Sequence, residues 1–423
     1  MDNVIISPGR LNGEVIIPPS KSAAHRNIIC AALADGVSRV SPLCHSDDID
    51  ATINGMRALG AEISEENGSF VIRGISEKSL PKTHVTIDCG ESGSTLRFLL
   101  PVAAALGVNT TFIGKGRLPN RPIDELTSVL SSNGVLCSGN HLPLTISGRL
   151  TSGCYSISGN ISSQYLTGLL LALPLVKNSK IKLSTNLESA GYVSMTMSIM
   201  KEFGVTVINE GNVFSSFGEY RFASSFIESD WSQACFYMTA CALGADISLL
   251  GLNINSVQGD SAAPKIYKKF GAEFEFKNNR LVLSSFDLIA ADIDCTDIPD
   301  MVPSLAVLAS VAKGKSLFYG AKRLRLKESD RILSTVSGLK ALGIKAEETD
   351  DGMIVYGSNE FPQGNTIIQG FNDHRIVMAF SILSSFAKNP VTITDAGAIN
   401  KSYPGFFEDF KSLGGCVDVI TNR

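Results

Sequence analysis

The stretch MRALGAEISEENGSFVIRG, residues 56–74, reads as a helix end, a glycine, and two alternating strand-like runs joined by a turn. A glycine after the last helical turn predicts a C-cap, because glycine takes the left-handed backbone conformation at low cost. The alternating runs around Glu-Asn-Gly predict a β-hairpin. The same pattern returns as LSSNGVLCSGNHLPLTISG (130–148), MKEFGVTVINEGNVFSSFG (200–218), YKKFGAEFEFKNNRLVLSS (267–285), LKALGIKAEETDDGMIVYG (339–357) and, shortened, FKSLGGCVDVITNR (410–423). The sequence therefore predicts six repeats of about 70 residues, since the shared glycines are spaced by 67 to 74 residues: Gly60, Gly134, Gly204, Gly271, Gly343 and Gly414.

A second series of predicted helices has the same period and is apolar on every side. Strand-like runs precede several of them, such as HVTIDC (84–89) and CYSIS (154–158), so that each repeat reads as β-α-β-α-β-β. A helix that is apolar on every side must be buried. Six buried helices cannot share one small core, so two groups of three are expected. A solenoid serving as a binding scaffold is the alternative, although solenoid units are shorter, about 20 to 50 residues. The helix heads are SKSAAHR (20–26), ESGSTLR (91–97), SSQYLTG (162–168), SDWSQAC (229–235), PDMVPSL (299–305) and NDHRIVM (372–378).

The composition excludes several classes of protein. The 423 residues are 44% hydrophobic, enough for a large core, and the net charge of −4 argues against nucleic acid or an acidic membrane as the main partner. Nine cysteines without a C-x-x-C pair predict free thiols in a reducing compartment. The start, MDNVIISPGRLNG, lacks the order of a signal peptide, and the longest apolar run, GLLLALPLV, is too short to span a membrane. A cytoplasmic protein is expected.

The heads of the buried helices carry polar and cationic residues. A helix N-terminus exposes N–H groups and a partial positive charge, which suits anions and phosphate above all. Ordinary capping is the alternative, and it is favoured for Ser229, Asp230 and Asp373. Capping does not explain Arg26, Arg97 and Arg375, because a cation near a helix start opposes the dipole. We expect a bound anion as the partner of these arginines.

Further cations lie outside the buried helices, where a solvated surface charge is the alternative for any single one. They are found in GKGRLPNRPIDEL (114–126), in GAKRLRLKESDRI (320–332) and in NKSYPGFFEDF (400–410). A nucleic-acid patch is a weaker alternative for the second segment, since acidic residues interrupt it.

Taken in order, these motifs resemble the 5-enolpyruvylshikimate-3-phosphate (EPSP) synthase family. The resemblance implies a two-domain inside-out α/β barrel in which each domain has three βαβαββ repeats and the buried helices point their N-termini at an interdomain cleft. It places domain I at residues 1–18 plus 229–423 and domain II at residues 19–228. The motifs are S-K-S-x-x-x-R (20–26), the Gly-Ser…Arg head (93–97), Arg-Pro-Ile (121–123), Ser-Ser-Gln (162–164), Ile-Pro-Asp (298–300), Leu-Lys-Glu-Ser-Asp-Arg (326–331), Asn-Asp-His-Arg (372–375) and the late lysine, Lys401.

Two other families share the fold. UDP-N-acetylglucosamine enolpyruvyl transferases typically have Lys-Asn where this chain has Lys21-Ser22, and they usually carry a cysteine in the loop that here reads GKGRLPNRPI. RNA 3′-phosphate cyclases are more distant, and no motif supports them. The EPSP synthase resemblance is therefore favoured.

The resemblance implies transfer of the enolpyruvyl group of phosphoenolpyruvate (PEP) to the 5-hydroxyl of shikimate 3-phosphate, with release of phosphate. It implies no metal and no organic cofactor, no nucleic-acid or membrane partner, and a monomer. By the resemblance, Asp300 deprotonates the 5-hydroxyl, Glu328 moves the proton at C3 of PEP, and Lys21 is a second candidate for proton transfer. The residues implied for shikimate 3-phosphate are Lys21, Ser22, Arg26, Ser162, Ser163, Gln164, Ser189, Asp300 and Lys327. Those implied for PEP are Lys21, Gly93, Arg121, Gln164, Arg331, Arg375 and Lys401.

Further residues are expected near the implied substrate-binding residues, and three positions differ from the usual pattern of the family. Arg97 is expected to support the Gly93 helix head from behind, Tyr192 to pack near Ser189, and Asp47 and Asp48 to pair with basic residues. The stretch Glu91–Ser94 reads Glu-Ser-Gly-Ser where the family often has Asn-Ala-Gly-Thr, and Phe98 stands where a proline is usual. Arg323 stands where many members have an asparagine that contacts the shikimate ring.

Overall fold

The structure is a computed structural model that describes residues 2–420. Met1 and residues 421–423 lie outside the described residues, and with them the first residue of the predicted domain I and the end of the shortened sixth repeat. The chain divides into two compact units: unit 1 is Met1–Pro18 with Ser229–Arg423, and unit 2 is Pro19–Glu228.

Unit 2 contains three four-stranded sheets, in the orders β14-β3-β5-β4, β6-β7-β9-β8 and β10-β11-β13-β12. In each sheet the first two strands are parallel, and a hairpin follows in antiparallel register. The strands are β3 (Val37–Ser41), β4 (Glu62–Glu66), β5 (Ser69–Arg73), β6 (Val85–Asp88), β7 (Thr110–Ile113), β8 (Val135–Cys137), β9 (Leu144–Gly148), β10 (Cys154–Ile157), β11 (Lys180–Leu183), β12 (Thr206–Glu210), β13 (Val213–Phe217) and β14 (Ser224–Phe226).

Unit 1 repeats this plan in sheets ordered β22-β23-β1-β24, β16-β17-β15-β2 and β18-β19-β21-β20. The two N-terminal strands complete sheets of the second half of the chain: β2 pairs with β15 in parallel, and β1 pairs with β23 and β24 in antiparallel register. The sixth repeat is short because β1 supplies its last strand. The strands are β1 (Asn3–Ser7), β2 (Asn12–Ile16), β15 (Asp246–Leu250), β16 (Ala272–Lys277), β17 (Arg280–Phe286), β18 (Ile293–Asp294), β19 (Gly314–Tyr319), β20 (Ala346–Thr349), β21 (Gly352–Gly357), β22 (Thr366–Ile368), β23 (Val391–Ile393) and β24 (Cys416–Ile420).

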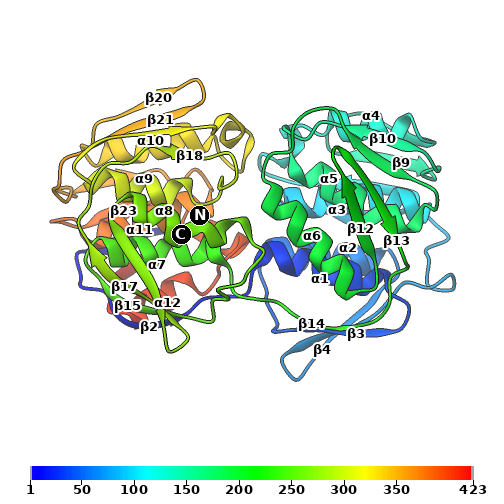
Figure 1. Cartoon of the computed structure of the whole chain (residues 1–423), viewed down its shortest axis with the longest axis horizontal. Helices are drawn as coiled ribbons and strands as arrows, with labels where there is room; N and C mark the ends of the chain where they lie inside the picture. Colours follow the sequence, from blue (N-terminus) through cyan, green and yellow to red (C-terminus); the bar gives the residue numbers. More distant parts are fainter. Residues whose placement is uncertain (1, 421–423) are drawn as a thin grey trace. The chain divides into compact units, whose positions relative to one another are not determined.

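Two helices accompany each sheet, one buried and one amphipathic, as the repeat predicts. Within each unit the buried helices run inside the sheets (Figure 1), and every residue of α7, α9 and α11 is buried. The buried helices are α1 (Lys21–Leu33), α3 (Gly93–Leu106), α5 (Ser163–Ala172), α7 (Trp231–Ala242), α9 (Val302–Val311) and α11 (His374–Ser385). The amphipathic helices are α2 (Asp47–Ala58), α4 (Asp124–Ser131), α6 (Ala190–Glu202), α8 (Ala263–Lys269), α10 (Arg331–Ala341) and α12 (Phe406–Ser412).

The six repeat glycines occupy the backbone conformation that the sequence predicts for them. Each follows an amphipathic helix with a positive φ, from 79° at Gly343 to 107° at Gly60. A side chain at such a position would strain the backbone, so the glycine fixes where the helix stops and where the hairpin starts. The β-α-β-α-β-β repeat is confirmed in the six sheets, and in three of them one strand comes from a distant part of the chain: β14 beside β3, β2 beside β15 and β1 beside β24.

The structure also bears on the cysteines and on membrane-spanning segments. All nine cysteines, each of them among the described residues, are free. Between residues 2 and 420, no helix combines the length and the apolar character needed to cross a bilayer.

Candidate active site

The head of α1 presents a lysine that is held by a carboxylate. Ser20 caps the helix by accepting a hydrogen bond from the Ala23 N–H, and the next residue, Lys21, directs its Nζ to Asp48 Oδ2 at 2.8 Å. Asp48 lies in the first turn of α2 and is nearly buried, whereas Asp47 is exposed. The pairing predicted for this acidic dipeptide is therefore confirmed for Asp48.

Arg26 lies one turn further along α1 and is 2% exposed. Within the protein its guanidinium contacts neutral oxygens and the Phe98 ring face, and the bound anion expected for it stays a prediction. Burial lowers the pKa of Arg26 to about 10. The contacts join α1 to α5 and α6: Thr196 Oγ1 at 2.7 Å, Thr167 Oγ1 at 3.3 Å, and the carbonyl oxygens of Ser22 at 2.6 Å and Tyr192 at 3.3 Å.

Two guanidinium groups converge on the first residue of α3. A Cβ placed on Gly93 would lie 2.8 Å from Arg121 Nη1 and 2.9 Å from Arg97 Nη1. Arg97, which was expected to support the helix head from behind, thus lies beside Arg121 at Gly93. Its other contacts are with Gln164 Oε1 at 2.7 Å and the Pro122 carbonyl at 3.1 Å. Glycine at this position leaves room for both cations at a helix N-terminus, a place suited to an anion.

The head of α5 is tied to the head of α3 through one amide. Ser162 caps α5 by accepting a hydrogen bond from the Gln164 N–H, and the Gln164 side chain donates to Ser94 Oγ at 3.0 Å while accepting from Arg97. Ser163 is buried beside it. Ser189 is also buried, immediately before α6, in a left-handed conformation with φ of 54°.

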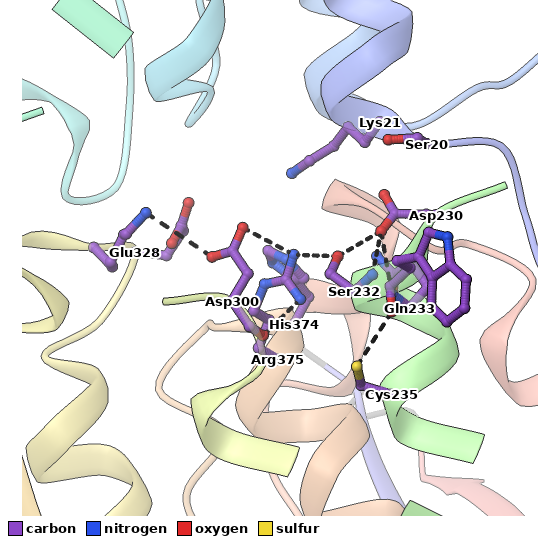
Figure 2. A network of polar contacts seen from close by, with 12 residues as sticks. Ser20, Lys21, Asp230, Ser232, Gln233, Cys235, Asp300, Glu328, His374 and Arg375 are labelled. Carbon is purple, nitrogen blue, oxygen red and sulfur yellow. Dashed lines mark hydrogen bonds and ion pairs between the residues drawn. The ribbon is translucent and has the colours of Figure 1, made fainter. Parts of the chain in front are cut away.

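In unit 1, the Asp300 carboxylate contacts three cations, and Figure 2 shows its contact with one of them, Arg375. Asp300 is not a helix cap: α9 begins at Val302, after Met301, and Asp300 directs its carboxylate at cations from other segments. Burial alone would raise the pKa of Asp300, but the charges of Arg375, Lys327 and Arg331 outweigh it and hold this pKa well below 3.8. The distances to Asp300 oxygens are 2.7 Å from Arg331 Nη1, 3.2 Å from Arg375 Nη2 and 3.9 Å from Lys327 Nζ.

Arg331 joins three carboxylates at the start of α10 and is 1% exposed. Besides Asp300, its Nη2 lies 2.6 Å from Glu328 Oε2 and its Nε lies 2.9 Å from Asp373 Oδ2. Burial alone would lower the pKa of Arg331, but Asp373, Glu328 and Asp300 raise it above its ordinary value. This guanidinium is permanently charged, and it fixes the two candidate acid–base groups relative to each other.

A hydrogen-bonded chain that the sequence analysis did not predict reaches Arg375 from α7. Ser232 Oγ donates to Asp230 Oδ1 at 2.5 Å and accepts from Arg375 Nη2 at 3.0 Å, and Arg375 in turn contacts Asp300, as Figure 2 shows. Asp230 also caps α7, as predicted, by accepting from the Ser232 and Gln233 N–H groups. The available signal was a serine two residues after a capping aspartate.

The remaining predicted residues of unit 1 lie at the heads of α7 and α11 and in two short 3-10 helices. Asp373 caps α11 as predicted, whereas Ser229 does not cap α7, because its hydroxyl donates to the Ile17 carbonyl instead. Lys401, 6% exposed, donates to the Asn372 carbonyl at 2.7 Å, next to the α11 head. Arg323 donates to the Thr296 carbonyl at 2.8 Å. Among residues 2–420, no group of three or more histidine, cysteine, aspartate or glutamate side chains forms a metal-binding set.

Comparison with known proteins decides the family. The family model of EPSP synthase (3-phosphoshikimate 1-carboxyvinyltransferase) matches residues 5–410. The chain belongs to the EPSP synthase family. It is 40% identical to the 3-phosphoshikimate 1-carboxyvinyltransferase of Clostridium novyi (strain NT) and 42% identical to that of Clostridium kluyveri, and each alignment covers 99% of both chains.

Solved structures agree with this family and with the fold class. An EPSP synthase from Acinetobacter baumannii superposes with a TM-score of 0.80 at 26% identity, over all of both chains. The enolpyruvyl transferase NikO from Streptomyces tendae gives a TM-score of 0.79 at 17% identity, also over all of both chains, which shows a shared fold alone. The resemblance drawn from the motifs is confirmed, and so is the two-domain inside-out α/β architecture.

Proposed function

We propose that this EPSP synthase family member transfers the enolpyruvyl group of PEP to the 5-hydroxyl of shikimate 3-phosphate and releases inorganic phosphate. The observation that carries the proposal is the set of three cations around Asp300, namely Lys327, Arg331 and Arg375. Further cations lie at the N-termini of the buried helices α1 and α3. Both substrates carry a phosphate and a carboxylate, and arginine and lysine at helix heads bind such groups well.

Residues of unit 2 would hold shikimate 3-phosphate mainly through the heads of α1 and α5. Lys21, Ser22 and Arg26 would contribute from α1, and Ser162, Ser163 and Gln164 from α5. Ser189 would contribute from the start of α6, and Lys327 and Asp300 from unit 1. The support is that Lys21 is the first residue of α1, directly before Ser22, and that Asp48 holds its ammonium group at 2.8 Å at this helix N-terminus.

PEP would be held by the Gly93 head and by the cations of unit 1. In unit 2 its charged groups would meet Gly93, Arg121, Lys21 and Gln164. In unit 1 they would meet Arg331, Arg375 and Lys401. The support is that Gly93, which lacks a Cβ, lets two guanidinium groups approach the first N–H groups of α3.

The chemistry would proceed by addition and elimination. The 5-hydroxyl oxygen bonds to C2 of PEP as Asp300 takes its proton, and C3 gains a proton from Glu328 or Lys21. The tetrahedral adduct then loses phosphate from C2 and a proton from the new methyl group, which restores the carbon–carbon double bond. The positive charges of Arg375, Lys327 and Arg331 lower the pKa of Asp300 when no other anion shares them. Substrate anions would share these cations and raise the pKa of Asp300, so that it becomes a better base when both substrates are bound.

Phosphate release tests the proposal. The purified protein should release phosphate only when PEP and shikimate 3-phosphate are present together. Turnover with UDP-N-acetylglucosamine in place of shikimate 3-phosphate would identify the protein as a UDP-N-acetylglucosamine enolpyruvyl transferase. Absence of phosphate release with either acceptor would indicate a non-catalytic binding scaffold.

The same proposal includes the setting of the enzyme. We propose that it acts as a cytoplasmic monomer with two domains, residues 1–18 plus 229–423 and residues 19–228, and that it needs no metal or organic cofactor. The nine free cysteines support a reducing compartment, and the two compact units support the two domains. Light scattering after size exclusion tests the monomer, and turnover after chelation tests the absence of a metal requirement.

A further inference from the structure

A chain of buried polar side chains runs beneath the heads of α1 and α3 in unit 2. It begins at His25, whose Nδ1 lies 2.7 Å from Thr52 Oγ1, and Thr52 Oγ1 lies 2.7 Å from Thr95 Oγ1. Thr95 Oγ1 contacts Ser92 Oγ at 2.8 Å, and Ser92 is the residue that caps α3. None of these four side chains is more than 1% exposed. Neither His25 nor Thr52 is among the residues predicted to bind a substrate or to move a proton.

The far end of this chain touches the residues that hold both helix heads. Thr95 Oγ1 also lies 3.2 Å from the Asp48 carbonyl, and the carboxylate of the same Asp48 binds Lys21. Ser92 accepts the Thr95 N–H at 3.1 Å and directly precedes Gly93. The orientation of one hydroxyl, that of Thr95, therefore bears on the start of α3 and on the Asp48 backbone.

The acceptors fix the direction of the hydrogen bonds. The Thr95 hydroxyl donates on the side of Ser92 Oγ, at 2.8 Å, and the Asp48 carbonyl, at 3.2 Å. It therefore accepts from Thr52, and Thr52 in turn accepts from His25. His25 Nδ1 must then carry the proton. Burial, with the charges of Lys21 and Arg26, holds the pKa of His25 well below 6.5, so the ring is neutral. Its buried Nε2 has no hydrogen-bond partner among the described residues, and a bare lone pair costs less there than an orphan N–H.

We propose that His25, as the neutral Nδ1–H tautomer, is a positioning residue for the PEP side of the site. Through Thr52 it orients Thr95 and Ser92, and so it sets the first turn of α3 against Arg97 and Arg121 at Gly93. The inference rests on the proposed function, and it assigns a task to residues outside the predicted site. We expect the effect mainly on PEP, because Ser92 directly precedes Gly93, whereas the contact with Asp48 is to its backbone carbonyl and not to the carboxylate that binds Lys21.

Kinetics of threonine variants test the positioning role. Thr52→Val keeps the side-chain shape and breaks the chain, so KM for PEP should rise about tenfold, the scale of one buried hydrogen bond. KM for shikimate 3-phosphate and kcat should stay within threefold. Thr52→Ser restores the hydroxyl and should restore KM for PEP. The matched control is Thr110→Val, since Thr110 is equally buried in β7 and donates only to the Val108 carbonyl at 2.9 Å.

The outcomes separate positioning from general stability. Thr110→Val should leave both KM values within threefold of the wild type. If Thr52→Val leaves KM for PEP unchanged, or raises KM for both substrates equally, the inference is overturned. His25→Asn, which keeps an N–H donor near the Nδ1 position, should retain a KM for PEP within threefold of the wild type. His25→Leu should raise this KM as Thr52→Val does.

Ring-nitrogen NMR of the ¹⁵N-histidine-labelled chain tests the tautomer without turnover. Nδ1 of His25 should be protonated and Nε2 bare, and a protonated Nε2 would refute the inference. If the wild type releases no phosphate from PEP and shikimate 3-phosphate, the proposed function fails. The tautomer measurement still tests the polar chain in that case. A protonated Nδ1 means that His25 donates to Thr52, and a protonated Nε2 means that it does not.

Discussion

Replacing Asp300 by asparagine removes a charge from the cationic cluster while keeping the shape of the side chain. Asparagine still offers an oxygen to Arg331 Nη1, which lies 2.7 Å from Asp300 Oδ1. Arg331 keeps Glu328 and Asp373, and Arg375 keeps Ser232 and the Asp300 carbonyl. The two arginines are therefore not left as unpaired buried charges, and the variant is expected to fold.

The magnitudes follow from these contacts. Two charge-assisted hydrogen bonds become bonds to a neutral oxygen, at about 1 kcal/mol each, so the unfolding free energy should fall by about 2 kcal/mol at neutral pH. Because the pKa of Asp300 is lower in the folded state, its contribution is present above the unfolded pKa of about 4. The difference from the wild type should therefore shrink as the pH falls below 4. Loss of a positioned base should lower kcat about 10²- to 10⁴-fold, about 3 to 5 kcal/mol in the barrier.

Substrate binding should change in the opposite direction. With Asp300 neutral, Arg331, Arg375 and Lys327 lose an internal competitor for the substrate anions, so PEP should bind more tightly. The assay is steady-state phosphate release together with calorimetric titration of PEP. Glu348→Gln is the control, because it removes an ion pair with Arg325 in the same unit, 2.8 Å apart, outside the candidate site. A kcat within threefold of the wild type, or weaker PEP binding, would refute the role given to Asp300.

Three further predictions concern single side chains. Gly93→Ala should raise KM for PEP about tenfold with little change in KM for shikimate 3-phosphate, because the new Cβ would displace the Arg121 guanidinium from 2.8 Å; equal effects on both substrates would count against this assignment. Lys401→Ala should weaken PEP binding more than it lowers kcat, because it acts by charge pairing in the ground state; a fall in kcat at constant KM would contradict it. His45 should titrate above 6.5 by NMR, because its hydrogen bond with Asp50 favours the charged ring; the stabilisation is present below pH 6.5 and is lost as the pH rises through the folded pKa, and a His45→Gln variant should lack this pH dependence.

The repeat made much of the fold predictable, because glycines with positive φ and helices that are apolar on every side are local signals. One feature could not be predicted in this way. The sixth repeat lacks its last strand in sequence order, and β1, at the other end of the chain, fills the place beside β24. Strand pairing of this kind depends on the closed set of three sheets and not on the residues next to β24.

The contacts that each side chain makes were harder to predict from the sequence than the positions at which the helices begin. The sequence showed that Arg26, Arg97 and Arg375 needed partners, but it could not show that Thr196, 170 positions away, would satisfy Arg26. Ser232 was missed for the same reason, since its role depends on the approach of α11 to α7. Asp300 was predicted as a site residue, but its three cations come from segments that only the folded unit brings together. The roles of all these residues in binding remain predictions.

Identification of the product tests the central claim most directly. The purified protein, given PEP and shikimate 3-phosphate in D₂O, should yield inorganic phosphate and an enolpyruvyl ether at the 5-oxygen. Deuterium should enter the vinyl CH₂ group, because C3 takes a solvent-derived hydron before another is lost. Phosphate and proton NMR together observe these changes. Release of phosphate without the ether, or an ether formed on UDP-N-acetylglucosamine and not on shikimate 3-phosphate, would contradict the account.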